Sequence, residues 1–186
     1  HRPRPQLGAI CPGAEVERQG QEIGMFAPDE FVATLTELGI SHVVWIPDTT
    51  LGQWDEALRA APGIELVQVC REGEAWAVAA GLYLGGKQPI VVIQCTGLFE
   101  SGDALRNVVH DYQLPIYGLI GYRSYLNASS LPGDTCLKFT EPIVEAWGLD
   151  TVFLKDESMK PLFAEHFHKC AAAQTPGLCL MAEGAA

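Results

Sequence analysis

The chain has 186 residues, which is enough for one domain with a full hydrophobic core. Hydrophobic residues make up 48% of it and charged residues 19%, a balance typical of a globular protein and not of a disordered one. The net charge of −11 argues against nucleic acid or an anionic membrane surface as a partner. No apolar run approaches the roughly 20 residues that a membrane span needs.

Six cysteines are spread along the chain without a C-x-x-C pair. Several lie in apolar segments, where a free cysteine behaves as a small hydrophobe. This distribution indicates a reducing, cytoplasmic compartment, and we expect no metal ligands in this chain. His166 and His168 do not change this expectation, because two residues that are two apart on a helix do not share a face.

The first 24 residues are rich in proline and glycine and have no sustained period, which predicts a mobile leader. We expect a single folded domain over residues 25–184, in which strands and helices alternate. Loops are predicted at 96–102 and 122–134, and Ser158 is predicted to cap the last helix. The predicted strands are 41–46, 64–69, 88–95, 114–121, 151–154 and 177–182; the predicted helices begin at Pro28 and then cover 51–61, 75–84, 103–111, 137–147 and 158–173.

This alternation predicts an α/β fold with a doubly wound, mostly parallel six-stranded sheet and helices on both faces. Loops that follow parallel strands gather at one edge of the sheet, where ligands bind in this class of fold. The loops expected there carry polar residues, and they are 48–50, 71–72, 96–102 and 122–124.

Glu72 lies where the second predicted strand passes into an alanine-rich helix. One interpretation is an ordinary acidic residue at a helix N-terminus, where the macrodipole favours negative charge. The other is a functional carboxylate, since the small residues of the following helix allow another group to approach closely.

Four segments together resemble the pyrimidine-binding domain of thiamine-diphosphate enzymes. Residues 72–81 resemble the pattern E-x-x-A-x-x-A-A-x-G, with Val78 in place of the first alanine of the pair. IPDTTL (46–51), TGL (96–98) and IGYR (120–123) resemble the P-D-S/T-x-L, S-G-L/I-G-N and I-G-W/Y-R segments of phosphonopyruvate and sulfopyruvate decarboxylases. The chain departs from the third pattern, because FESG replaces its short G-N.

The resemblance implies a role for each matched residue. Glu72 would be catalytic and would bind the cofactor, because a carboxyl hydrogen-bonded to the aminopyrimidine favours its imino tautomer. Asp48 would be a second catalytic acid facing the substrate, and Thr96, Gly97 and Leu98 would approach the cofactor ring. Arg123 and Thr49 would bind the substrate. From position alone, Asp48 is an N-terminal helix cap. Arg123 is equally a partner in a surface salt bridge.

The family binds the cofactor's diphosphate through Mg²⁺ with a G-D-G motif and a later N-N pair. Gly102-Asp103-Ala104 and Gly133-Asp134-Thr135 do not meet this pattern. The resemblance therefore implies half of an active site, with Mg²⁺ held by a partner chain of the diphosphate-binding, beta-subunit kind in a homo- or hetero-oligomer.

The resulting hypothesis has three forms. The first is the alpha subunit of a thiamine-diphosphate-dependent 2-keto acid decarboxylase, a carboxy-lyase of the sulfopyruvate decarboxylase kind with the thiamine-diphosphate-binding fold. The second keeps the cofactor but makes the protein a carboligase of the acetolactate-synthase kind. The third is a non-catalytic, flavodoxin-like scaffold or regulatory module.

Overall fold

Six short apolar segments form a parallel sheet in the computed structural model, which describes residues 24–184. The strand order is β2-β1-β3-β4-β6-β5, and each neighbouring pair is parallel. The sheet was expected to be mostly parallel, and the described part is parallel throughout. The strands are β1 (His42–Trp45), β2 (Glu65–Gln68), β3 (Pro89–Gln94), β4 (Tyr117–Tyr122), β5 (Asp150–Leu154) and β6 (Gly177–Ala182).

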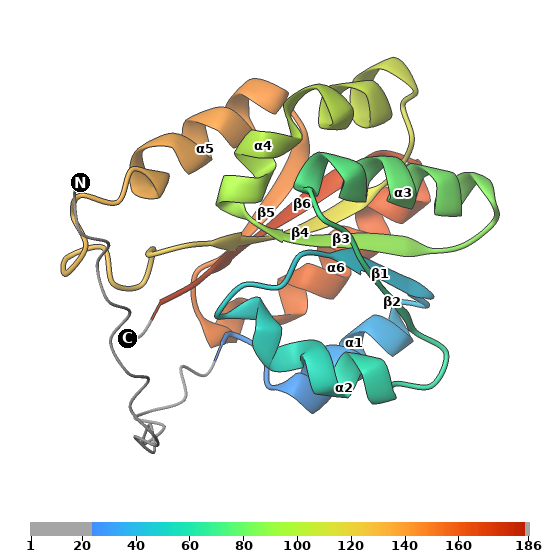
Figure 1. Cartoon of the computed structure of the whole chain (residues 1–186), viewed down its shortest axis with the longest axis horizontal. Coiled ribbons are helices and arrows are strands. Elements are labelled where there is room, and N and C mark those ends of the chain that lie inside the picture. Colours follow the sequence, from blue (N-terminus) through green and yellow to red (C-terminus); the bar gives the residue numbers. More distant parts are fainter. Residues whose placement is uncertain (1–23, 185–186) are drawn as a thin grey trace, which may run out of the picture.

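Six α-helices cover the two faces of this sheet (Figure 1). On one face lie α1 (Pro28–Glu37), α2 (Asp55–Ala60) and α6 (Pro161–Ala173). On the other lie α3 (Glu72–Leu84), α4 (Cys95–Arg106) and α5 (Cys136–Trp147). The predicted doubly wound α/β architecture is confirmed. Short turns of other helix types complete the set: η1 (Leu51–Trp54), the π-helical η2 (Asn107–Asp111) and η3 (Glu157–Met159).

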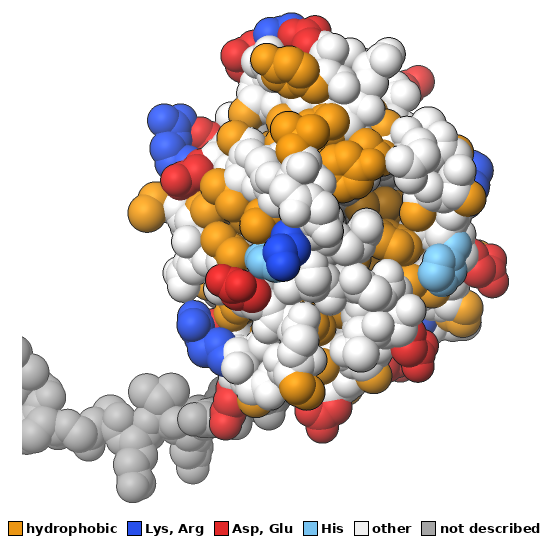
Figure 2. All heavy atoms as spheres, turned by 90° about the vertical axis from the view of Figure 1, so that its right-hand side faces the viewer, with side chains coloured by type: hydrophobic (Ala, Val, Ile, Leu, Met, Phe, Trp, Pro, Cys, Tyr) orange, Lys and Arg blue, Asp and Glu red, His pale blue; other side chains and the backbone are white. Residues whose placement is uncertain are grey.

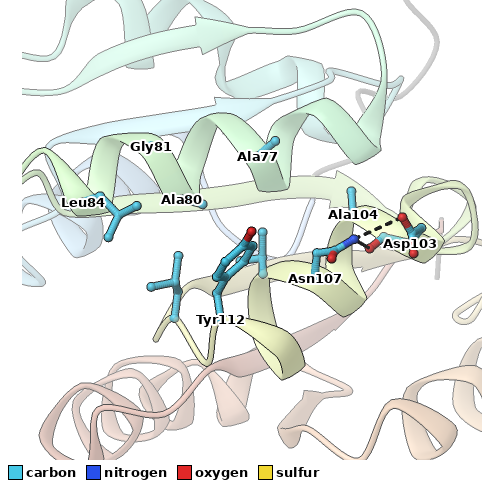
Figure 3. Close-up of a pocket in the computed structure, with 10 residues that line it drawn as sticks. Ala77, Ala80, Gly81, Leu84, Asp103, Ala104, Asn107 and Tyr112 are labelled. Carbon is cyan, nitrogen blue, oxygen red and sulfur yellow. Dashed lines mark hydrogen bonds between the residues drawn. The ribbon is translucent and has the colours of Figure 1, made fainter.

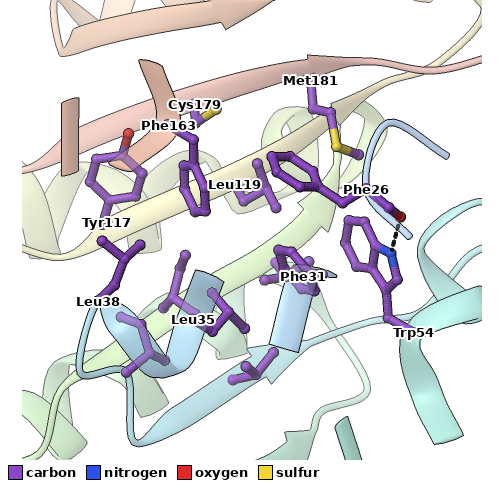
Figure 4. Packing of buried hydrophobic residues seen from close by; sticks show 14 of the residues in the cluster. Phe26, Phe31, Leu35, Leu38, Trp54, Tyr117, Leu119, Phe163, Cys179 and Met181 are labelled. Carbon is purple, nitrogen blue, oxygen red and sulfur yellow. Dashed lines mark hydrogen bonds between the residues drawn. The ribbon is translucent and has the colours of Figure 1, made fainter. Parts of the chain in front are cut away.

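Each face of the sheet has its own hydrophobic core, because successive strand residues point to opposite faces. In the core below α1 and α6, Phe31 stacks on Trp54 with ring centroids 3.8 Å apart. The Trp54 indole N–H donates to the carbonyl of Phe26 at 3.0 Å, so the aromatic ring is buried without an unpaired polar group (Figure 4). In the core below α3, the Trp76 indole N–H donates to Ser101 Oγ at 2.9 Å.

The predicted loop at residues 96–102 is wrong, because helix α4 already begins at Cys95 and includes these residues. The glycines at 97 and 102 favour a loop locally. Packing on α3 overrides that preference: Leu98 is fully buried on the core side, and Ser101 Oγ donates back to the Gly97 carbonyl at 2.7 Å. The local preference survives only at Gly102, whose positive φ of 25° kinks the helix.

Other element boundaries shift for identifiable reasons. The predicted helix 51–61 divides into η1 and α2. Strand β4 starts at Tyr117 and not at residue 114, since Pro115 has no N–H to donate to a neighbouring strand. Ser158 does not cap the last helix: Asp156 caps the short turn η3 by accepting the Ser158 N–H at 2.9 Å, and α6 begins after Lys160 without a side-chain cap.

The sequence also predicted a mobile leader and no membrane-spanning segment. The predicted leader lies, apart from Gly24, outside the described residues. Gly24 itself is buried and its N–H donates to Gln53 Oε1 at 3.3 Å. In the part of the chain that the structure describes, every helix is too short or too polar to cross a membrane.

Candidate active site

A polar cavity of about 350 Å³ opens at the carboxyl ends of β1, β3, β4 and β6. Sequence reasoning expected ligands at this edge, and the cavity brings together three of its candidate residues, Asp48, Thr49 and Arg123. The complete lining is Asp48, Thr49, Thr50, Gln94, Arg123, Ser124, Asn127, Glu183 and Gly184.

Asp48 combines the two roles that the sequence left open. Its Oδ1 accepts the backbone N–H groups of Thr50 at 2.9 Å and Leu51 at 2.7 Å, as a helix cap does. Its Oδ2 accepts a hydrogen bond from Gln94 Nε2 on the cavity side. The cap orients the carboxylate, and the second oxygen lines the cavity.

Glu183 is a cavity residue that sequence reasoning missed. It follows β6 and is only 3% exposed, and Gln94 Nε2 donates to its Oε2 at 3.4 Å. Gly121 makes room for it, because a Cβ at that position would lie 2.5 Å from Glu183 Cδ. The one sequence signal was an acidic residue directly after a fully apolar strand. Gln94 thus joins two carboxylates, Asp48 and Glu183, across the cavity floor.

Arg123 lies at the mouth of the cavity and forms the ion pair that the sequence analysis gave as an alternative. Its Nε donates to Asp134 Oδ2 at 3.1 Å, and its side chain is 55% exposed. The Cys136 N–H and the Ser124 hydroxyl, with Arg123 a smaller contributor, hold the pKa of Asp134 below its usual value. Asp134 therefore remains charged at neutral pH and anchors Arg123 beside the cavity.

Glu72 begins α3 and is half-buried, with its side chain lying over the backbone of Gly97. A Cβ at position 97 would lie 2.8 Å from both Glu72 Cδ and Oε1, so only glycine accommodates the carboxyl in this position. The structure therefore brings together two residues that the resemblance assigned to the cofactor. Among residues 24–184, the Glu72 carboxyl makes no hydrogen bond or ion pair.

Two other carboxylates satisfy the N-terminus of α3. Glu100 Oε2 accepts the Gly73 N–H at 2.7 Å, and Glu74 Oε2 accepts the Cys70 N–H at 3.1 Å. The Gly73 N–H and then Arg71, whose Nε donates to Glu100 Oε1 at 2.9 Å, lower the pKa of Glu100. The Glu72 carboxyl is therefore not needed as the acceptor of the Gly73 N–H, and its interpretation as a helix-start charge rests on the macrodipole alone.

The remaining candidates of this loop, Thr96 and Leu98, have different surroundings. The Thr96 hydroxyl is exposed and donates to Gln94 Oε1 at 3.1 Å, which connects it to the amide between Asp48 and Glu183. Leu98 is fully buried in the core below α3. Its side chain supports α4 from within.

A second hollow is apolar and follows helix α3. It has a volume of about 650 Å³ and lies between α3 and the segment formed by α4 and η2 (Figure 3). Leu84 and Tyr112 on its border are 73% and 72% exposed. It shares Asp103 and Ala104 with a neighbouring hollow beside Arg71 and Gly73 at the start of α3.

Residues 25–114 match the family described as "Thiamine pyrophosphate enzyme, N-terminal TPP binding domain". The matched region contains Asp48, Glu72 and Gly97, three of the residues that the geometry singles out. Over residues 25–114 this match confirms the resemblance to the pyrimidine-binding domain of thiamine pyrophosphate enzymes that the sequence motifs indicated.

Individual relatives show which thiamine pyrophosphate enzymes this chain is similar to. The chain is 33% identical over 91 residues to the sulfopyruvate decarboxylase subunit alpha of Methanothermobacter thermautotrophicus, an alignment covering 49% of this chain and 55% of that subunit. It is 29% identical over 102 residues to the same subunit of Methanococcus maripaludis, covering 55% and 61%. The phosphonopyruvate decarboxylase of Streptomyces viridochromogenes is 31% identical over 99 residues, which cover 53% of this chain and 25% of that enzyme.

Solved structures share the fold at low sequence identity. Benzoylformate decarboxylase from Polynucleobacter necessarius superposes with a TM-score of 0.61 at 18% identity, covering 85% of this chain and 29% of that one. The 2-oxoglutarate:ferredoxin oxidoreductase from Magnetococcus marinus also gives 0.61, at 15% identity, covering 95% and 32%. In both cases the chain corresponds to about a third of the larger protein.

The donor groups of the described residues fit the pyrimidine half of a thiamine-diphosphate site and not the metal half. A hard cation such as Mg²⁺ prefers carboxylate and carbonyl oxygens that are available to it. Asp103 of the first degenerate G-D-G segment already accepts hydrogen bonds from Arg106 at 2.8 Å and Asn107 at 3.1 Å. Asp134 of the second is held by Arg123 and Ser124.

Proposed function

We propose that this chain is the alpha subunit of a thiamine-diphosphate-dependent 2-keto acid decarboxylase, with a substrate of the sulfopyruvate kind. The main support for this proposal is the position of the Glu72 carboxyl, which is half-buried, lies over Gly97 and has no hydrogen-bond partner among residues 24–184. A carboxyl in this setting is available to hydrogen-bond a ring nitrogen. Thiamine diphosphate, when bound, supplies the carbon nucleophile and the electron sink for loss of carbon dioxide.

The role of Glu72 is to hold and exchange a proton with the aminopyrimidine ring. Proton transfer by a positioned side chain typically contributes about 10²–10⁴-fold to a rate. We therefore expect Glu72→Gln, assayed with the partner chain, cofactor and Mg²⁺, to lose at least about 100-fold in kcat. Circular dichroism of the variant should match the wild type, because Glu72 makes no bond that supports the fold.

Glu74→Gln is the matched control for this experiment. It lies on the same helix turn and removes the same charge, but its carboxyl bonds the Cys70 N–H. Its activity should stay within a few-fold of the wild type. Normal decarboxylation by Glu72→Gln would overturn the proposal and favour a non-catalytic module.

The cavity of Asp48, Thr49 and Arg123 supports binding of a small acid with two anionic groups. Arg123 presents a guanidinium at the mouth, and guanidinium geometry suits carboxylate, sulfonate or phosphonate. On the floor, Asp48 and Glu183 flank Gln94, and in this proposal they would serve as proton donors or acceptors toward the bound substrate. Sulfopyruvate, phosphonopyruvate and pyruvate should be compared as substrates. The appearance of a ligated hydroxyketone in place of an aldehyde would identify a carboligase.

A partner chain completes the site in this proposal. The relatives from the two methanogens are named as alpha subunits, and the described residues lack a diphosphate motif. The apolar hollow along α3 shares Asp103 and Ala104 with the hollow beside Gly73. A partner that covers both hollows would also reach the Glu72 end of the helix. Titration calorimetry of the isolated chain should give weak cofactor binding, and a micromolar Kd without a partner would contradict this arrangement.

A further inference from the structure

A second cluster of chemically active side chains lies at the opposite edge of the sheet from the candidate active site. Asp150, Tyr117 and Gly177 are the first residues of β5, β4 and β6, and they are in register with one another. His166 and Cys170 reach this edge from helix α6. Because they are four residues apart, they lie on one face of the helix.

The side chains of Asp150, His166 and Cys170 converge on one point. Asp150 Oδ1 lies 3.2 Å from His166 Nε2, and Cys170 Sγ lies 3.7 Å from the same nitrogen. All three atoms lie within 4.8 Å of one another. A tetrahedral zinc ion with Zn–N and Zn–O bonds of about 2.0 Å and a Zn–S bond of about 2.3 Å places its ligands about 3.3 Å (N to O) and about 3.6 Å (N to S) apart.

The surroundings hold these three ligand atoms in place. Tyr117 Oη lies 2.6 Å from His166 Nδ1, which fixes the ring and leaves Nε2 directed at the other two groups. Lys169 Nζ lies 2.6 Å from Asp150 Oδ2, so that Oδ1 remains directed at the histidine. Gly177 provides the space for the thiol, because a Cβ there would lie 2.6 Å from Cys170 Sγ.

In the absence of an ion, a neutral His166 can donate its Nε2 hydrogen to Asp150 Oδ1 while the Tyr117 hydroxyl donates to Nδ1, and the Cys170 sulfur lies beside the same Nε2. An ion at this point would take the place of the Nε2 hydrogen and bind all three ligand atoms at once. His166 and Cys170 are 8% and 2% exposed, whereas the Asp150 side chain is 38% exposed and opens the cluster to solvent. Figure 2 shows the surface at this end of the molecule, where histidine, acidic and basic side chains lie among hydrophobic ones.

We propose that Asp150, His166 and Cys170 bind a zinc ion, with water as the fourth ligand. Nitrogen, sulfur and oxygen are the ligand atoms that zinc takes in proteins. On binding, Cys170 releases its thiol proton to solvent, and the thiolate and the carboxylate balance the charge of the ion. The ion joins helix α6 to the edge strand β5, on the far side of the sheet from Glu72. The proposed zinc site is therefore separate from the decarboxylation proposed above.

Cobalt(II) is the probe that tests this site on the full chain after treatment with a chelator. We expect one cobalt ion per chain, with the visible bands of a tetrahedral ion and a thiolate charge-transfer band. Cys170→Ser should remove the charge-transfer band and weaken zinc binding more than about 100-fold. Loss of a residue that only hydrogen-bonds a metal ligand typically weakens binding by up to about 100-fold, and loss of a ligand itself should cost more. His168→Ala, on the exposed side of the same helix, and Cys70→Ser, at an exposed thiol, should keep both.

A second measurement does not depend on the folding of a variant. Zinc should slow alkylation of Cys170 in the wild-type chain, as measured by peptide mass mapping, and should leave alkylation of Cys70 unchanged. Absence of the charge-transfer band, an undiminished band in Cys170→Ser, or alkylation of Cys170 at the same rate with and without zinc would each overturn the proposal.

Discussion

The amino ends of the parallel strands form one edge of the sheet, the amino edge, and their carboxyl ends form the opposite, carboxyl edge. The two edges surround their carboxylates with different partners. At the amino edge, Asp150 lies 2.6 Å from Lys169 Nζ and 3.2 Å from His166 Nε2, and these contacts, Lys169 first, lower its pKa. At the carboxyl edge, Asp48 and Glu183 share the neutral amide of Gln94, and the Glu72 carboxyl has no partner among the described residues.

This difference distinguishes the proposed zinc site, where the acid is already paired within the chain, from Glu72, which is arranged for a ligand that forms a hydrogen bond with it. A carboxylate withdrawn from water destabilises the fold unless it is hydrogen-bonded or paired with a cation. The amino edge compensates its acid within the chain. The carboxyl edge leaves Glu72 uncompensated, which is expected of a group whose partner is a bound molecule.

The largest expected effect comes from filling the space below Glu72. Gly97→Ala would place a Cβ 2.8 Å from Glu72 Cδ and push the carboxyl out of position. Misplacing a catalytic group by about 1 Å can cost about 10²-fold in rate, so kcat with the partner chain should fall by about that factor. Gly73→Ala is the control, because its Cβ would meet only ordinary contacts at 3.4 Å and beyond. Equal activity of the two variants would refute the proposed role of the Gly97 backbone.

A smaller effect is expected at the other acid of the cavity. Gly121→Ala would put a Cβ 2.5 Å from Glu183 Cδ in a buried strand, and overpacking of this kind typically destabilises by about 1–3 kcal/mol. Urea denaturation should detect this loss. Gly133→Ala, where nothing lies within 4 Å of the added Cβ, should unfold at the wild-type midpoint. A Gly121→Ala variant as stable as the wild type would mean that Glu183 leaves its position freely.

The smallest predicted effect depends on pH. The pKa of Asp134 is lowered in the folded state by the Cys136 N–H and the Ser124 hydroxyl, so its charged form stabilises the fold above the unfolded pKa of about 3.9. That contribution disappears as the pH falls through the lower, folded pKa. We expect Asp134→Asn to lose about 1 kcal/mol near pH 6 and to approach the wild type in strong acid. Denaturation midpoints over this pH range measure the difference, and a constant difference at all pH values would contradict the assignment.

The local pattern of the sequence was enough to predict the layered α/β fold, and the polar cavity opens at the edge where the sequence predicted a site. Apolar runs such as 88–95 and 177–182 identify strands without reference to the rest of the chain, and strand–helix alternation implies parallel pairing. Glu72 could be singled out in the same way, because its motif is contiguous. Residues 96–101 were predicted wrongly, since the packing of Leu98 and Ser101 against α3 outweighs the local preference of two glycines.

The sequence alone therefore determined which segments are strands and helices and which acid begins the third helix, because both depend on residues close together in the chain. Only the tertiary structure decided that Gly97 makes room for Glu72, that Gln94 joins Asp48 to Glu183, and that Asp150 meets His166 and Cys170. These contacts join residues from separate elements, and their geometry arises only when the sheet brings the ends of its strands together.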